Sequence, residues 1–165
     1  MTLPAALLDR LRRVRLLALD VDGVLTDGRL YFQADGIEIK AFHTQDGHGL
    51  KLLKRVGVHV ALITGRDSPM VSQRAAALGI DHVHQGCEDK LATLRGLCQR
   101  LDIELEQVAY CGDDLPDLAA IKRCGVGITV PNAPDYMHTH ADWTTERLGG
   151  HGAVREICDT LLESQ

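Results

Sequence analysis

The chain has 165 residues, of which 45% are hydrophobic and 25% are charged, and its formal net charge is −5. This length suits one domain with a sizeable core, and we expect a single domain over residues 1–165. The negative charge argues against a nucleic-acid-binding protein, which usually presents a basic face, and no apolar run is long enough to span a bilayer.

Apolar runs alternate along the chain with segments of helical periodicity. This alternation predicts an α/β fold in which crossover helices connect the strands of a central parallel sheet. We expect strands, in chain order, at Arg15–Asp20, Val58–Ile63, His82–His84, Gln107–Cys111 and Val126–Thr129. We expect helices at about Pro4–Arg13, then at Gly49–Val56, Ser68–Leu78, Glu88–Leu101, Pro116–Lys122 and Ala153–Leu162.

One stretch, Arg29–Phe42, departs from this alternation. Two short apolar strands flank Ala34-Asp35-Gly36, a turn sequence with glycine where a positive φ is needed, so we expect a β-hairpin inserted over about residues 29–42. A two-stranded hairpin is marginally stable in water by itself. Its apolar side chains should therefore pack against their own domain or against another subunit, and both alternatives stay open.

The cysteines are five in number and form no Cys-x-x-Cys pair. An odd count without such pairs argues against a disulfide framework and against a zinc cluster. The amino-terminal segment has arginines inside its apolar stretch, unlike a secretory signal peptide. We therefore expect a cytoplasmic protein with reduced thiols.

The most informative motif, Asp20-Val21-Asp22-Gly23, follows the first expected strand. Ligands of open parallel sheets bind beyond the carboxyl ends of the strands. Two carboxylates one residue apart suit a nucleophile and an acid/base partner, provided that the chain curls after Asp20, which Gly23 permits. By itself, this motif is more typical of a solvated turn after a strand.

Three further elements follow later strands. Thr64-Gly65 offers a hydroxyl and backbone amides to a phosphate oxygen near the start of a helix. Lys90 lies in the first turn of a helix, where the macrodipole disfavours a cation, and this placement suits the neutralisation of a phosphate. The segment from Gly112 to Asp117, GDDLPD, gathers the oxygen ligands that Mg²⁺ prefers, although its second or third carboxylate is equally suited to cap a helix. Each element is common alone, but their order on four successive strand ends favours a catalytic site.

In this order the four motifs resemble those of the haloacid dehalogenase superfamily of phosphatases, and the resemblance runs from Leu16 to Leu162. Within that superfamily the chain is similar to the 3-deoxy-D-manno-octulosonate 8-phosphate (KDO 8-phosphate) phosphatases. The similar segments are LALDVDGVLTDGRLYF, AFHTQDGHGLKLL, ALITGRDSPMVSQRAAALGI, AYCGDDLPDL and GGHGAVREICDTLL. The resemblance implies a three-layer Rossmann-like fold whose small hairpin replaces a large cap domain, a homotetramer formed through that hairpin, and a role in lipopolysaccharide precursor synthesis.

The resemblance also implies roles for individual residues. Asp20 would attack phosphorus and form an aspartyl-phosphate, while Asp22 would protonate the leaving oxygen and later deprotonate water. Mg²⁺ would be held by the Asp20 carboxylate, the Asp22 backbone carbonyl and Asp113. Thr64 and Lys90 would bind the oxygens of the transferring phosphoryl group.

The resemblance also gives Asp114 a supporting role, in which it would orient the metal shell or Lys90.

Contacts to the sugar-acid phosphate are implied by the same resemblance. Arg66 and Arg74 lie eight residues apart, so both could face the mouth of the site, where an arginine fork suits a carboxylate. The full set of expected substrate contacts is Asp22, His43, Thr44, Gln45, Asp46, Gly47, Lys51, Arg66, Arg74 and Lys90.

The chain departs from a well-studied branch of this family at positions that concern the substrate. His43 and Gln45 stand where that branch has Asn and Arg, Lys51 stands where Arg is common, and His151 stands in the tail where Arg is frequent. These departures keep open a phosphatase for a nine-carbon keto-sugar acid 9-phosphate of the sialic acid type.

Two alternatives come from other functional classes. A phospho-receiver signalling domain shares the parallel sheet, an aspartyl-phosphate, a Thr and a Lys, but it carries its acidic pair on the first strand and its acceptor on a later one. Here the Asp20-Val21-Asp22 motif comes first, and Asp22 has no receiver counterpart. A catalytically silent scaffold that assembles through its hairpin is disfavoured by the complete set of motif residues.

Overall fold

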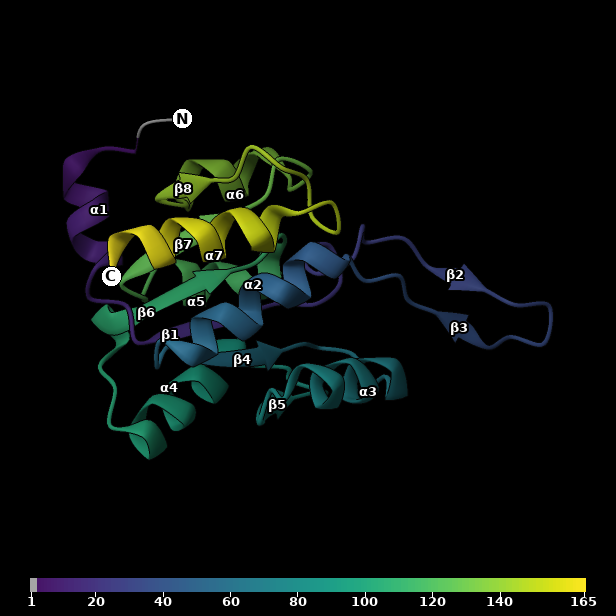
Figure 1. Cartoon of the computed structure of the whole chain (residues 1–165). Coiled ribbons are helices and arrows are strands. Elements are labelled where there is room, and N and C mark those ends of the chain that lie inside the picture. The colour runs from purple at the N-terminus through teal and green to yellow at the C-terminus, as the bar shows by residue number, and fades with distance from the viewer. Residues whose placement is uncertain (1–2) are drawn as a thin grey trace.

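The computed structural model describes residues 3–165 and contains one parallel sheet, with its strands in the order β5-β4-β1-β6-β7-β8 (Figure 1). These strands are β1 (Leu16–Leu19), β4 (His59–Ile63), β5 (His82–His84), β6 (Val108–Cys111), β7 (Val126–Thr129) and β8 (Trp143–Thr144). The helices are α1 (Ala5–Leu11), α2 (Thr44–Arg55), α3 (Pro69–Leu78), α4 (Lys90–Leu101), α5 (Leu115–Ile121), α6 (Asp135–His140) and α7 (Ala153–Ser164), with a 3₁₀ turn, η1, at Leu105–Gln107.

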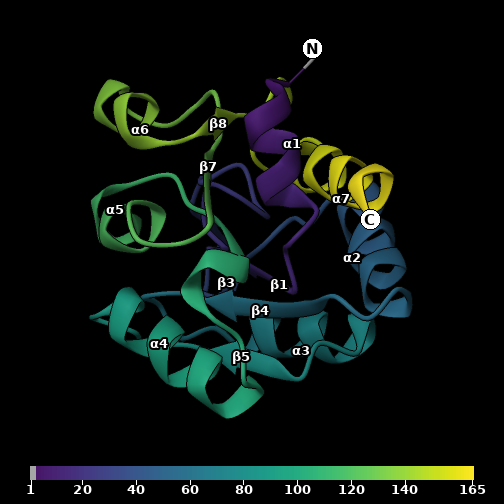
Figure 2. The same ribbon diagram turned by 90° about the vertical axis from the view of Figure 1, so that its left-hand side faces the viewer.

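Helices cover both faces of the sheet, which gives the expected three layers (Figure 2). α1, α2 and α7 lie on one face, with α2 packed closely along α7, while α4 and α5 lie side by side on the other. All residues of β1, β6 and β7 are buried, as strands covered on both faces require. Within the part of the chain that the structure describes, no helix is long and apolar enough to cross a membrane.

The strand order places a topological switch point at β1. Its neighbours β4 and β6 both follow it in the chain. The chain adds β4 and β5 on one side of β1 and then crosses back to add β6, β7 and β8 on the other side. Such a point leaves a crevice at the carboxyl ends of the strands. The four motifs identified in the sequence all lie at this edge.

The hairpin is the part of the fold that stands apart from the layers. Its strands β2 (Tyr31–Phe32) and β3 (Glu38–Ile39) pair in antiparallel fashion and project away from the body (Figure 1). Leu30 and Phe32 remain 56% and 60% exposed, so most apolar side chains of the hairpin are not buried on its own domain, whereas Phe42 at its end packs against the core. Of the two alternatives left open by the sequence, packing against its own domain is therefore wrong for most of the hairpin in the single chain.

Several elements differ from the sequence-based expectation, including the short helix α6 (Asp135–His140), which the sequence did not lead us to expect. α2 begins at Thr44, five residues before the expected start, because Gly47 and Gly49 lower helix propensity and hid its first turn. A Cβ at Gly49 would lie 2.9 Å from the Cys158 Cβ, so this glycine allows α2 to pack closely against α7. A Cβ at Gly47 would lie 2.3 Å from an Arg74 nitrogen and would require the end of that side chain to move. The sixth strand, β8, is only two residues long and too short to show a periodic pattern.

Candidate active site

The strand-end motifs come together in one cavity of about 470 Å³. Asp20 follows β1, Thr64 follows β4, Lys90 opens α4 after β5, and Asp113 lies two residues after β6. These residues line the cavity together with Asp22, Gly65, Arg66, Cys87, Glu88, Asp114, Pro116 and Asp117. The structure thus brings the five motif side chains together in one cavity at the rim of the sheet.

Gly23 makes this convergence possible. The chain turns sharply after β1, with a φ of 92° at Gly23, which is the curl expected from the sequence. A Cβ at this position would lie 1.9 Å from a carboxylate oxygen of Asp113. Glycine thus allows the loop after β1 to lie directly against the loop after β6.

The Asp20 carboxylate is fixed from two sides. Its Oδ1 accepts a hydrogen bond from the backbone N–H of Val21 at 2.7 Å and pairs with the Lys90 ammonium at 2.9 Å. Asp20 is 7% exposed and Lys90 is 3% exposed, so this is a nearly buried ion pair. Such a pair persists only when both partners are well hydrogen bonded.

Asp117 supplies the remaining partner of Lys90. Its fully buried carboxylate accepts from the Lys90 ammonium at 2.8 Å, and from the hydroxyl of Tyr110, also fully buried, at 2.7 Å. Its other oxygen accepts the backbone N–H groups of Asp113 and Asp114 at 3.2 and 3.4 Å. Asp117 therefore holds both the lysine and the loop that carries Asp113.

This arrangement corrects the expectation for Asp114. We expected Asp114 to orient the metal shell or Lys90, but the contact to Lys90 is made by Asp117. Asp114 instead caps α5, accepting the backbone N–H of Leu115 at 2.8 Å, and it also accepts the hydroxyl of Tyr136. The physical reason is helix geometry, because the residue at the cap points back along its own helix while Asp117, one turn later, faces the core. The role of Asp114 beside a metal stays a prediction.

The buried charges perturb one another. Burial, reinforced by the charge of Asp117, raises the pKa of Asp20 well above its ordinary value. Burial likewise raises the pKa of Asp113 to about 6, with the charges of Asp117 and Asp114 adding to the effect. Burial disfavours the Lys90 ammonium, but the carboxylates of Asp20 and Asp117 outweigh it and raise its pKa. The site therefore carries more negative charge than one lysine neutralises.

The donor set of this site suits a hard divalent cation. Carboxylate oxygens of Asp20, Asp113 and Asp117 all lie within 4.8 Å of one another. Asp117 already serves four donors, so Asp20 and Asp113 are the carboxylates left to bind a metal. A cation between them would offset the burial and the charge of Asp117, which raise the pKa values of both carboxylates, and oxygen ligands of this kind fit Mg²⁺.

Asp22 lies at the mouth of the cavity and is held by the base of the hairpin. Its Oδ1 pairs with the Lys40 ammonium, and its Oδ2 lies 3.9 Å from the Arg66 guanidinium. Arg66 in turn forms a bidentate pair with Glu38 at 2.9 and 2.8 Å. Thr64, another residue of the cavity lining, is 2% exposed and accepts the Arg66 backbone N–H at 3.5 Å. Sequence reasoning did not identify Lys40 or Glu38, although they lie two residues apart on one face of the expected hairpin.

The other expected substrate contacts lie outside this cavity. Arg74 packs across α2, where its guanidinium lies 5.8 Å from the Phe42 ring and donates to the His43 carbonyl at 3.3 Å. Arg66 precedes α3, which starts at Pro69, so the spacing of eight residues does not place the two arginines on one helix face. His43, Thr44, Gln45, Gly47 and Lys51 are likewise absent from the cavity lining.

Asp46 requires a second correction. Its side chain is 1% exposed, and its Oδ1 accepts the Arg155 backbone N–H of α7 at 2.8 Å. The carboxylate thus caps α7 from the first turn of α2, and burial raises its pKa. A side chain buried between two helices does not reach a substrate, so the expected substrate contact of Asp46 is wrong.

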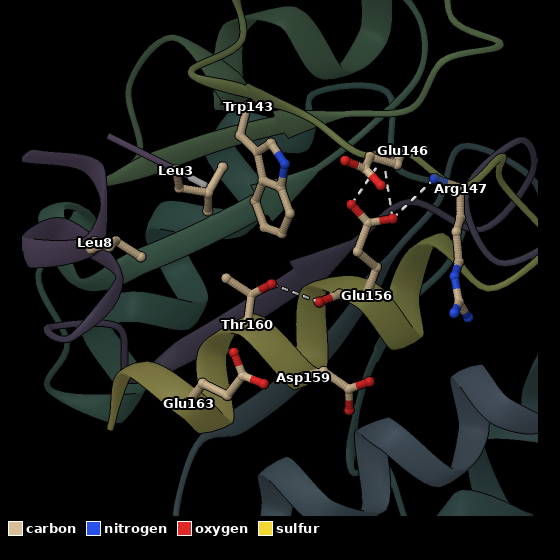
Figure 3. Close-up of a pocket in the computed structure, with 9 residues that line it drawn as sticks. All are labelled: Leu3, Leu8, Trp143, Glu146, Arg147, Glu156, Asp159, Thr160 and Glu163. Atoms are coloured by element: carbon tan, nitrogen blue, oxygen red, sulfur yellow. Dashed lines mark hydrogen bonds between the residues drawn. The ribbon is translucent and has the colours of Figure 1, made fainter. Parts of the chain in front are cut away.

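A second cavity of similar volume, about 480 Å³, lies between α1, β8 and α7 (Figure 3). Its lining contains the carboxylates of Glu146, Glu156, Asp159 and Glu163. Glu156 accepts the backbone N–H groups of Glu146 and Arg147 at 2.8 and 2.9 Å and so serves the loop before α7 (Figure 3). None of the four strand-end motifs lines this second cavity, which favours the cavity around Asp20 as the active site.

Comparisons with known proteins agree with this choice. Residues 83–157 match the family model of haloacid dehalogenase-like hydrolases. The 3-deoxy-D-manno-octulosonate 8-phosphate phosphatase of Escherichia coli (strain K12) is 43% identical over 161 residues, which cover 98% of this chain and 86% of that protein. The same enzyme of Salmonella typhimurium is 45% identical over 152 residues, covering 92% of this chain and 81% of the relative.

Solved structures show the same similarity. The Moraxella catarrhalis KDO 8-phosphate phosphatase, in complex with a magnesium ion, a phosphate ion and KDO, superposes with a TM-score of 0.95 at 48% identity. That match covers 97% of this chain and 92% of the other. The cobalt-bound enzyme of Haemophilus influenzae gives a TM-score of 0.91 at 40% identity, covering 94% of this chain and 91% of the other.

Proposed function

The chain belongs to the KDO 8-phosphate phosphatases, a family of haloacid dehalogenase-like hydrolases, and from this premise we propose that it hydrolyses KDO 8-phosphate to KDO and phosphate. The observation that carries the proposal is the single cavity that contains Asp20, Asp22, Thr64, Lys90 and Asp113. We place this reaction in the cytoplasm and in the synthesis of lipopolysaccharide precursors. The free thiols of all five cysteines support a reducing compartment.

Asp20 is the proposed nucleophile. One carboxylate oxygen forms a bond to phosphorus as the bond from phosphorus to the sugar oxygen breaks, and the product is an aspartyl-phosphate. The contacts of Val21 and Lys90 to Oδ1 support this role because they fix the orientation of the carboxylate. Water then attacks the phosphorus, and Asp20 leaves as a free carboxylate with inorganic phosphate as the second product.

Asp22 is the proposed acid and base. It donates a proton to the sugar oxygen as that oxygen leaves, and it takes a proton from the attacking water in the second step. Its carboxylate supports this role because it lines the same cavity as Asp20 and is the more exposed of the two, with side chains 23% and 10% exposed. Thr64 and Lys90 hold the oxygens of the transferring phosphoryl group in both steps.

The metal of the proposed reaction is Mg²⁺, as in the Moraxella enzyme. The Asp20 and Asp113 carboxylates would hold it together with the Asp22 backbone carbonyl. When bound, it supplies positive charge that offsets the repulsion between a carboxylate nucleophile and a phosphate. Asp117 would keep Asp113 in place through its backbone N–H.

Substrate recognition in our proposal involves more than one subunit. Arg66 lines the cavity of its own chain, whereas Thr44, Gln45 and Lys51 are exposed outside it. We propose a homotetramer in which hairpins pack together and such residues, with His43, Gly47 and Arg74, help to complete a neighbouring site. The exposed apolar side chains of the hairpin support this assembly.

A second candidate substrate is a nine-carbon keto-sugar acid 9-phosphate. The observation in its favour is the pair Gln45 and Lys51, which stand where arginines are common in the octulosonate branch. Both candidates share the same phosphoryl chemistry and differ only in the contacts to the sugar acid.

Phosphate release from a panel of sugar-acid phosphates, measured with and without Mg²⁺, tests the proposal. We expect Mg²⁺-dependent release that is fastest with KDO 8-phosphate. Faster release from the nine-carbon 9-phosphate would transfer the proposal to the second candidate. Absence of release from every sugar-acid phosphate would contradict both.

A further inference from the structure

Two lysine side chains in this structure are only 3% exposed, and each ends on one carboxylate of the Asp20-Val21-Asp22 motif. Lys90 pairs with Asp20 and was expected from the sequence, whereas Lys40 pairs with Asp22 and was not. Lysines are almost never buried unless they are paired. A buried lysine on an insert whose other side chains are largely exposed therefore requires an explanation.

The surroundings of Lys40 form a compact cluster of alternating charge. Its ammonium pairs with Asp22 Oδ1 and lies 3.1 Å from Glu38 Oε1. Glu38 also pairs with Arg66, and the hydrogen bonds from Arg66 lower the pKa of Glu38. The hairpin strand thus delivers one cation and one anion to the mouth of the cavity, and the cation reaches Asp22.

The geometry separates attachment of the hairpin from the contact between Lys40 and Asp22. The bidentate Glu38–Arg66 pair already joins the hairpin to the loop after β4. Attachment of the hairpin alone would not need Lys40 to reach Asp22, which lies 18 residues earlier in the chain. The contact between Lys40 and Asp22 is therefore not needed for attachment, and its direct effect is on the position of the Asp22 carboxylate.

We propose that Lys40 is a positioning residue for the hydrolysis, holding the Asp22 carboxylate at the cavity mouth in the orientation that serves the leaving oxygen. This inference depends on the proposed role of Asp22 as acid and base. Its consequence is that the hairpin, besides any part in assembly, contributes directly to the chemistry of its own chain.

The leaving group of the substrate provides the test. A sugar phosphate loses an alkoxide that needs a proton, whereas p-nitrophenyl phosphate loses a phenolate that needs little help. With Lys40→Met we expect kcat for KDO 8-phosphate to fall roughly 10- to 100-fold, the usual effect of losing a supporting partner. With p-nitrophenyl phosphate we expect a decrease of less than about 3-fold, since general-acid assistance contributes little there. Lys122→Met, at an exposed lysine after α5, is the matched control and should change neither rate.

Two further variants separate positioning from folding. Lys40→Arg keeps the charge and should recover most of the rate with KDO 8-phosphate. Adding Lys40→Met to Asp22→Asn should cause no further loss, because Lys40 acts through Asp22. Equal losses on both substrates, or an additional loss in the double variant, would overturn the proposal and leave Lys40 a structural residue.

The same experiment distinguishes this inference from the proposed function. If Asp22→Asn fails to slow KDO 8-phosphate more than p-nitrophenyl phosphate, the acid and base role of Asp22 is wrong and the inference fails with it. If Asp22→Asn shows that selectivity and Lys40→Met does not, only the inference about Lys40 fails.

Discussion

The two carboxylates of the catalytic motif are held by different parts of the molecule. Lys90 binds Asp20 from the first turn of α4 and is itself fixed by Asp117, a fully buried residue. Lys40 binds Asp22 from the hairpin, most of whose apolar side chains are exposed. The proposed nucleophile, Asp20, thus depends on the core of the sheet, whereas the proposed acid and base, Asp22, depends on an insert. A variant in either support should therefore affect a different property of the enzyme.

The largest effect is expected when the core side loses the nucleophile itself. Asp20→Asn keeps the shape of the side chain but removes the attacking oxygen, so kcat should fall on the order of 10⁴-fold or more, as other nucleophile deletions do. Steady-state phosphate release measures this, with Asp9→Asn on the exposed face of α1 as the control. Retention of wild-type turnover by the variant would contradict the assignment of Asp20.

The next effect concerns the support behind Lys90. Asp117→Ala leaves the Tyr110 hydroxyl and the backbone N–H groups of Asp113 and Asp114 without their acceptor, and it should lower the free energy of unfolding by about 3–5 kcal/mol. Urea unfolding monitored by circular dichroism measures the change. Asp114→Ala is the matched control, because it removes a helix cap and an exposed contact to Tyr136 and should cost about 1 kcal/mol. Equal costs for both variants would show that Asp117 is not the central support.

A smaller effect is expected from Tyr110→Phe, which tests the support of Asp117 in the core. It removes only the hydroxyl that donates to Asp117 at 2.7 Å, and a hydrogen bond to a charged group contributes about 1.5–3 kcal/mol. Activity should fall only several-fold, because Lys90 keeps its own bond to Asp117. Tyr136→Phe, which loses an exposed hydroxyl contact to Asp114, should be close to neutral. A Tyr110 variant as stable as the Tyr136 variant would contradict this account.

The hairpin side should behave in the opposite way. Phe32→Ser and Ile37→Ser change side chains that are 60% and 56% exposed, so the stability of the single chain should change by less than about 0.5 kcal/mol. The proposed tetramer should nevertheless dissociate, which light scattering after gel filtration measures. Val56→Ser, at a side chain that is 55% exposed at the end of α2, should leave the assembly intact. A tetramer that survives the hairpin variants would exclude the hairpin as its interface.

The smallest effect lies away from both carboxylates, at Asp46. Burial raises the pKa of this group, so the folded state binds its proton more tightly than the unfolded state does. The stability that results is present at low pH and is lost as the pH rises from the ordinary carboxyl pKa through the raised one. Asp46→Asn cannot ionise and should flatten this part of the curve of urea midpoint against pH. An unchanged slope would contradict the attribution of this pH dependence to Asp46. The ratio of kcat with KDO 8-phosphate to kcat with p-nitrophenyl phosphate should stay as in the wild type.

The sequence by itself determined which strand ends carry the chemistry. Asp20, Thr64, Lys90 and Asp113 meet because the strands before them are parallel, and parallel strands bring their carboxyl ends to one edge of the sheet. The alternation of apolar runs was enough to place these strands. The hairpin was equally visible, since its turn sequence and its apolar flanks are local features.

Only the tertiary structure decided which partner each of these side chains meets. The choice of Asp117 over Asp114 as the partner of Lys90 depends on where α5 begins. The burial of the Asp46 carboxylate away from the cavity depends on how α7 packs against α2. The contact between Lys40 and Asp22 depends on the path of the hairpin back to the sheet. Motif spacing describes neighbours along one element, whereas an ion pair between elements is set by their packing. For that reason the catalytic edge could be predicted from the sequence, and the supports behind it could not.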